Sequence, residues 1–182
     1  MPRTLSATLL LMLCSASTAA APLTQWKYHD QDLSLNLRAR TPEQITAFYT
    51  ARKFPADMVK RLSDLCFITT RVTNNSGDVL WLDLDQWRFG NRDGELKRHD
   101  RLWLAGEMDK IDAPAASRAI LRWTLLPEQL DFKPEEQEGG NILLPRSTEP
   151  FSVHAVFARG QQRDGPAIRI SIDNLRCAEN KQ

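Results

Sequence analysis

The stretch CFITTRVTNNSGDVLWLDL, residues 66–84, predicts a β-hairpin. Its first half is rich in β-branched and aromatic residues, which favour strands. Residues 74–77, Asn-Asn-Ser-Gly, tolerate positive φ or bond their own backbone, as a tight turn requires. After this turn, three leucines alternate with Trp81 and Asp83, which is the period of a half-buried strand. The rest of the chain can be arranged around this pair of predicted strands.

The first twenty residues have the pattern of a cleaved signal peptide. Arg3 gives a positive start, residues 5–13 form an apolar run, and residues 15–21 are small. We expect cleavage after Ala20, because a cut one residue later would place a proline next to the scissile bond. This leaves residues 21–182 as one domain, in the periplasm or outside the cell.

A lipoprotein is the competing interpretation of the N-terminus, because Cys14 ends the apolar run. Leu13 argues against it, since lipoprotein processing needs a small residue directly before the cysteine. The run is also too short to span a bilayer as a stable anchor, and no later segment is long and apolar enough. The sequence therefore predicts a protein that does not span the membrane.

Two cysteines remain after export, Cys66 and Cys177. In an oxidising compartment such a pair predicts a disulfide, although two separate buried thiols are the alternative. Closing a loop of about 110 residues would stabilise the fold by up to roughly 4–5 kcal/mol in the chain-entropy model. The bond would tie the strand before the predicted turn to the last strand of the domain.

Residues 42–65 have the pattern of a short helical insertion that leads into Cys66. Thr41 suits the N-cap, Pro42 the first helical position, and Gln44 the capping-box position. Pro55 interrupts this helix and opens a second one.

Alternation and turn signals predict strands over most of the remaining chain. Residues 119–126 are expected to be a strand, with Leu121, Trp123 and Leu125 on one face, whereas residues 101–112 are ambiguous. A polar, acidic stretch at 127–140 is expected to cross from one sheet to another. Seven or eight short strands with a disulfide predict a mainly β protein, an antiparallel immunoglobulin-like β-sandwich, with a small barrel as the alternative. The other expected strands cover about 26–38, 86–89, 95–99, 141–144, 151–158 and 167–177.

Three tryptophans are the best candidates for a binding surface: Trp81, Trp87 and Trp103. Trp81 lies opposite the leucines of its predicted strand, so it would face away from the core. On a solvent face these rings would suit a sugar, a peptide or a partner surface. The alternative is that the helical insertion covers this face and buries them.

Asp83 and Asp85 are the candidate acids, because residues two apart share one face of a strand. Close carboxylates raise each other's pKa, as in a general acid, and also suit calcium. The alternative is that Arg88, Arg92 and Arg98 neutralise them on the solvent side. The acidic cluster at residues 135–138 lacks the spacing of a calcium loop and is interpreted as an exposed loop.

The sequence holds no catalytic motif, and its histidines are scattered, although His99 and His154 could meet on a sheet face. No metal, cofactor or catalytic residue is therefore assigned. The formal charge of +1 becomes zero without Arg3, so there is no electrostatic case for binding nucleic acid. We expect a non-enzymatic binding or accessory module that contacts an envelope or secreted protein, or a glycan, through the tryptophan face. The alternatives are a glycan-active hydrolase that uses paired carboxylates and a metal-handling protein.

Overall fold

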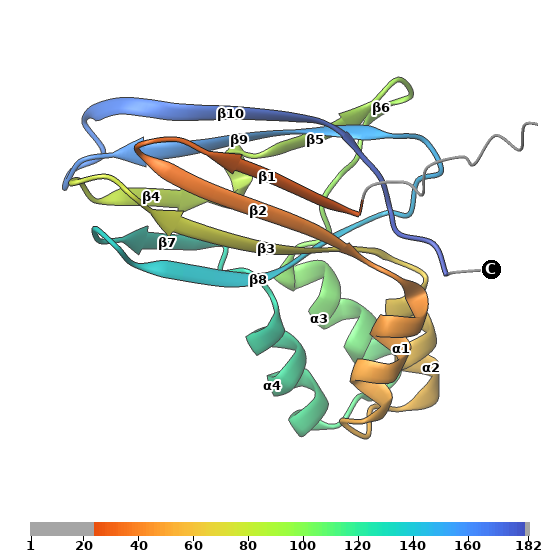
Figure 1. Cartoon of the computed structure of the whole chain (residues 1–182). Coiled ribbons are helices and arrows are strands. Elements are labelled where there is room, and N and C mark those ends of the chain that lie inside the picture. Colours follow the sequence, from red (N-terminus) through yellow and green to blue (C-terminus); the bar gives the residue numbers. More distant parts are fainter. Residues whose placement is uncertain (1–23, 181–182) are drawn as a thin grey trace, which may run out of the picture.

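The computed structural model describes residues 24–180 and is mainly β, with two antiparallel sheets and four helices gathered on one side of them (Figure 1). The predicted signal peptide lies outside the described residues. The strands are β1 (Gln25–His29), β2 (Leu33–Arg40), β3 (Cys66–Asn74), β4 (Leu80–Asp83), β5 (Arg88–Asn91), β6 (Gly94–Glu95), β7 (Gln129–Phe132), β8 (Gln137–Leu144), β9 (Phe151–Arg159) and β10 (Gly165–Leu175). The helices are α1 (Pro42–Thr50), α2 (Ala56–Ser63), α3 (Arg101–Lys110) and α4 (Ala115–Thr124), with a 3-10 turn η1 (Leu84–Gln86).

The two sheets form a sandwich-like pair around one core. The first sheet has the order β1-β2-β3-β8, and the second the order β6-β5-β9-β4-β7, with β10 also paired to β9. Alternate residues of both sheets face inward, as predicted for residues 33–37, 80–84 and 151–157, and they meet in a shared apolar cluster. Within the described residues, no helix is long and apolar enough to cross a membrane.

The predicted hairpin at residues 66–84 is wrong, because β3 and β4 belong to different sheets. β3 pairs with β2 and β8, whereas β4 pairs with β7 and β9. The fully buried Asn74 organises the crossing between them. Its side-chain amide donates to the carbonyls of Asp78 (2.7 Å) and Phe132 (2.9 Å), and its oxygen accepts the N–H of Ser76 (2.9 Å). The turn residues therefore build an arch between two sheets and not a two-strand turn.

The acidic stretch does cross between the sheets, as predicted, but it does so as two strands. β7 pairs with β4 in the second sheet, and β8 pairs with β3 in the first. Residues 86–89 also continue the preceding strand as expected: β4 and β5 both pair with β9, and η1 interrupts them.

The predicted insertion at 42–65 is confirmed as α1 and α2, and Thr41 and Gln44 form the expected capping box. These helices contribute to a second apolar cluster, which includes Phe67 of β3 and Leu143 of β8. Residues 66 and 68 face the sandwich core, so Phe67 points to the other side of the sheet. The helices therefore cover the part of the outer face of the first sheet around Phe67 and Leu143, and not the face that carries Trp81.

The strand predicted at 119–126 is wrong, because residues 115–124 form helix α4. Alternation at Leu121, Trp123 and Leu125 suggested a strand, but only Leu121 and Leu125 are buried, and a spacing of four places them on one side of a helix. Pro114 precedes the helix as its N-cap. Residues 101–110, which the sequence left open, form α3 with Asp100 as its N-cap.

The predicted disulfide is confirmed between Cys66 and Cys177, whose Cα atoms are 5.3 Å apart. Cys66 begins β3 in the first sheet, and Cys177 follows β10 in the second. Both are buried in the sandwich core. The bond therefore links the two sheets near the point where the chain leaves α2.

Candidate functional site

The three candidate tryptophans lie in three different environments. Trp87 is only 3% exposed and packs in the sandwich core, with ring centroids 5.5 Å from Phe157 and 6.4 Å from Phe89. Its prediction as a contact residue is therefore wrong: η1 ends before Trp87 and turns its side chain inward. Trp103 lies on α3, stacked on His99 with a centroid separation of 3.8 Å.

Trp81 lies on the outer face of β4, and the helices do not cover it. Its Nε1 donates to the carbonyl of Gly160 at 2.8 Å, and the guanidinium of Arg163 lies 4.4 Å from the ring centre. The β9–β10 turn therefore already occupies the edge and the face of this half-buried ring. The three tryptophans form no common platform.

Asp83 and Asp85 do not share a strand face, because β4 ends at Asp83. The Asp83 side chain caps η1 by accepting the N–H of Asp85 at 3.1 Å. The Asp85 carboxylate binds Arg98 at 3.1 Å, and Glu128 binds the same guanidinium at 2.7 Å. Asp85 is thus neutralised by an arginine, as the alternative interpretation held.

The two candidate histidines occupy separate places. His99 joins β8 through a bridge to Leu143, and burial lowers its pKa. His154 lies on the outer face of β9, where its Nδ1 is 2.8 Å from the hydroxyl of Ser171. Across residues 24–180, no group of three or more His, Cys, Asp or Glu side chains is arranged to hold a metal.

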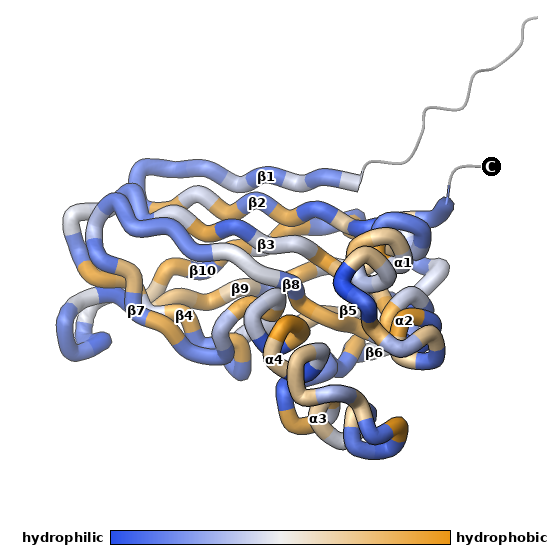
Figure 2. The backbone as a smooth tube through the Cα atoms, turned by 90° about the horizontal axis from the view of Figure 1, so that it is seen from below, coloured by the Kyte–Doolittle hydropathy of each residue, from blue (hydrophilic) through white to orange (hydrophobic). Residues whose placement is uncertain are grey.

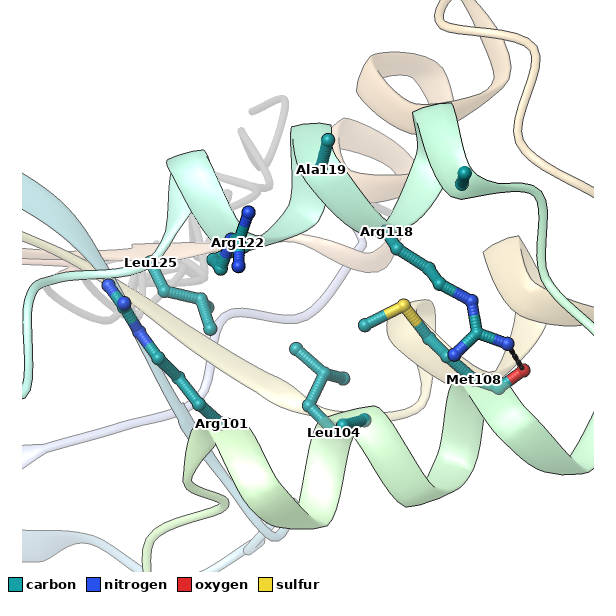
Figure 3. Close-up of a pocket in the computed structure, with 9 residues that line it drawn as sticks. Arg101, Leu104, Met108, Arg118, Ala119, Arg122 and Leu125 are labelled. Atoms are coloured by element: carbon teal, nitrogen blue, oxygen red, sulfur yellow. Dashed lines mark hydrogen bonds between the residues drawn. The ribbon is translucent and has the colours of Figure 1, made fainter.

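A groove between α3 and α4 is the candidate site that the sequence did not predict (Figure 3). Its volume is about 260 Å³. Leu104, Met108 and Leu125 supply apolar side chains, and alanines of both helices keep the space open. Residues 101, 104, 105 and 108 on α3, and 115, 118, 119 and 122 on α4, follow the helical spacing that places them on facing sides.

Three arginines line this groove, and they differ in their partners. Arg118 ties the helices together: it binds the Asp109 carboxylate and donates to the carbonyls of Ala113 (2.8 Å) and Met108 (3.1 Å). Arg101 and Arg122 form no salt bridge with any residue in the described part of the chain. The Nε of Arg101 is buried and has no hydrogen-bond partner there. Within residues 24–180 these two cationic groups therefore lack a carboxylate partner, which an anionic ligand would supply.

Two large apolar side chains next in sequence to Arg101 and Arg122 are exposed. Leu102 is 83% exposed and Trp123 is 84% exposed. Each follows an arginine of the groove by one position and does not itself line the groove. Apolar and aromatic residues beside arginines are typical of protein contact surfaces. α4 could have been predicted from the sequence, because Pro114 suits a helix start and the buried Leu121 and Leu125 are four residues apart.

A side-chain hydrogen bond joins α4 to α1. The hydroxyl of Tyr49 on α1 lies 3.1 Å from Oγ1 of Thr124, the last residue of α4. Tyr49 is 1% exposed, and its burial raises the pKa of the phenol to about 12. Gly140 lets the chain leave α4 close to β8, because a Cβ there would overlap the backbone of Leu126.

No family model matches the sequence, and no curated protein matches it. A solved structure with some similarity is that of a candidate lipoprotein from Bacillus subtilis, with a TM-score of 0.42 and 10% sequence identity. The similar region covers 83% of this chain and 38% of that one, so the chain spans well under half of that protein. At this level nothing is transferred from it, and the site is argued from its own geometry.

Proposed function

We propose that the protein is an exported binding or accessory module whose α3–α4 groove holds an apolar, acidic segment of an envelope or secreted partner. One observation carries the proposal: an open apolar groove in which Arg101 and Arg122 lack a carboxylate partner among residues 24–180. A partner segment would cover the apolar floor and the exposed Leu102 and Trp123. A carboxylate at one end of that segment would bind the two arginines.

Export is supported by the disulfide between Cys66 and Cys177, because such bonds persist in oxidising compartments. The signal-like residues 1–20 agree with it, and residues 21–182 would then be the mature single domain. Locating the protein in fractionated cells tests this part directly. The more specific prediction that the two sheets are connected as in an immunoglobulin-type sandwich stays a prediction.

The groove is better supported than the tryptophan sheet face as the contact surface. On that face Trp87 is in the core, and Arg163 already stacks on Trp81. The hydrolase alternative has less support as well, because Asp85 and Glu128 are held by one arginine and not across an open cleft.

A blocking substitution tests the groove. Ala119→Trp places a large side chain among the groove-lining residues, whereas Ala116→Trp puts the same side chain on α4 outside them. Tagged native protein and both variants are expressed in the source cells, and bound proteins are compared after gentle cross-linking. Circular dichroism and thermal melting show whether each variant is folded.

We expect one partner to be retained by the native protein and by Ala116→Trp, and to be lost with Ala119→Trp. Arg101→Gln combined with Arg122→Gln should weaken capture of that same partner by tenfold or more, equivalent to at least about 1.4 kcal/mol. If the folded Ala119→Trp variant captures everything that the native protein does, the groove is not the contact surface.

A further inference from the structure

A second surface lies on the outer face of the first sheet, beyond the part that the helices cover. Lys27 of β1, Arg38 and Arg40 of β2 and Arg71 of β3 line one shallow hollow there. Its volume is about 740 Å³. Trp26, Leu37 and Val72 belong to the sandwich core. Each is next in sequence to one of the cations, so the side chains of Lys27, Arg38 and Arg71 point to the opposite, outer face.

Strand pairing fixes the spacing of these charges. Lys27 pairs with Asn36, and Asn36 pairs with Arg71, so the two cations lie on strands two apart, about 10 Å between backbones. Arg38 and Arg40 are two residues apart on β2, about 7 Å along the strand. Four positive charges therefore lie too far apart for a single small anion to contact all of them.

None of the four cations forms a salt bridge with another residue in the 24–180 range. The hollow contains one carboxylate, Glu138, and its Oε1 accepts the backbone N–H of Gly139 at 2.8 Å. In a mature chain whose expected formal charge is zero, this face concentrates positive charge without matching acids.

Arg40 is held in place before any ligand arrives. Its Nε donates to Oγ1 of Thr69 at 2.8 Å, and that hydroxyl donates to Oδ1 of Asn141 at 2.8 Å. Partial burial and the neighbouring charge of Arg38 lower the pKa of Arg40. An anion bound between the two arginines would relieve this repulsion.

The other lining residues indicate the class of ligand. Gln25, Asn36 and Gln137 offer side-chain amides, which both donate and accept and so suit a ligand rich in hydroxyl groups. None of the described residues that line the hollow is aromatic, so it offers no stacking platform for bases. β1 shows only hydrophilic or intermediate colours along this edge (Figure 2).

We propose that this basic face binds an acidic polysaccharide, with Lys27, Arg38, Arg40 and Arg71 contacting its carboxylate or sulfate groups. The site is separate from the α3–α4 groove and does not depend on the function proposed for it. Because the contacts are ionic, affinity should fall steeply as salt increases.

The test measures dissociation constants of the full mature chain for labelled polygalacturonate and dextran sulfate, with neutral dextran and an oligothymidylate of similar charge as comparisons. Arg38→Gln with Arg71→Gln removes two charges from the face. Arg92→Gln with Arg163→Gln removes the same charge from turns of the second sheet. Both pairs are exposed positions, so neither should unfold the protein.

We expect both acidic polysaccharides to bind at low salt, neutral dextran not to bind, and the first pair of substitutions to weaken binding by tenfold or more. The control pair should change it less than threefold. Equal weakening by both pairs, no binding of either acidic polysaccharide, or tighter binding of the oligothymidylate would overturn the proposal.

Discussion

The core between the two sheets and the space between α3 and α4 are built differently. Between the sheets, side chains such as Leu82 and Phe157 are fully buried by residues of both layers. Between the helices, small residues leave an open groove, and the contact relies on Arg118, which binds Asp109 and the carbonyl of Met108 on α3. This difference assigns stability mainly to the sandwich and the binding of a protein partner mainly to the helical layer.

Breaking the disulfide should have the largest effect, because it constrains both regions at their junction. The double substitution Cys66→Ser and Cys177→Ser removes the bond that joins two residues 111 positions apart in the sequence. We expect the free energy of unfolding in urea to fall by up to about 4–5 kcal/mol. Reduced native protein is the control, and a loss below about 1 kcal/mol would mean that the bond does not constrain the unfolded chain as assumed.

A pair of leucine truncations compares the two regions directly. Leu82→Ala in the sandwich core should lower the free energy of unfolding by about 3–5 kcal/mol, since it leaves a closed cavity. Leu104→Ala on α3 should cost about 2–3 kcal/mol, the lower end of the range for a buried leucine, because the space it leaves joins the groove. Chemical denaturation measures both, and equal losses would contradict the distinction between a closed core and an open groove.

Alkaline pH should lower the free energy of unfolding, because Tyr49 is buried in its protonated form. The pKa of this phenol is about 12 in the folded protein and near 10 when unfolded, so the unfolded state loses its proton first as pH rises. Stability should therefore be lost between pH 10 and 12, by roughly 2–3 kcal/mol in total. Tyr49→Phe should remove this part of the pH dependence, and a native profile identical to that of the variant would refute the assignment.

Short-range patterns predicted much of the sandwich but little of the site. Alternation located most strands, and Thr41 with Gln44 identified α1, because these signals depend on neighbouring residues. The arch at Asn74 was missed because its partner, the carbonyl of Phe132, is distant in sequence. The same turn residues suit a hairpin and an arch, and tertiary contacts decide between them.

The groove could not be predicted once residues 119–126 were interpreted as a strand. Trp123 alternates with two leucines and so resembles a core residue, but it is 84% exposed. Four residues of α3 and five from α4 and its exit line the groove, and their proximity follows from the packing of both helices on the first sheet. Trp87 was misplaced for a similar reason, since η1 changes the direction of the strand.

Site-specific photo-cross-linking tests the assignment of recognition to the helical layer most directly. A photoreactive residue is placed at Ala119 in the groove and, separately, at Asp131, which pairs with Trp81 on the outer face of the second sheet. The groove position should give a cross-linked partner whose attached segment is apolar and carries a carboxylate, and position 131 should give none. A partner cross-linked from position 131 and not from position 119 would contradict the account and return recognition to the tryptophan face.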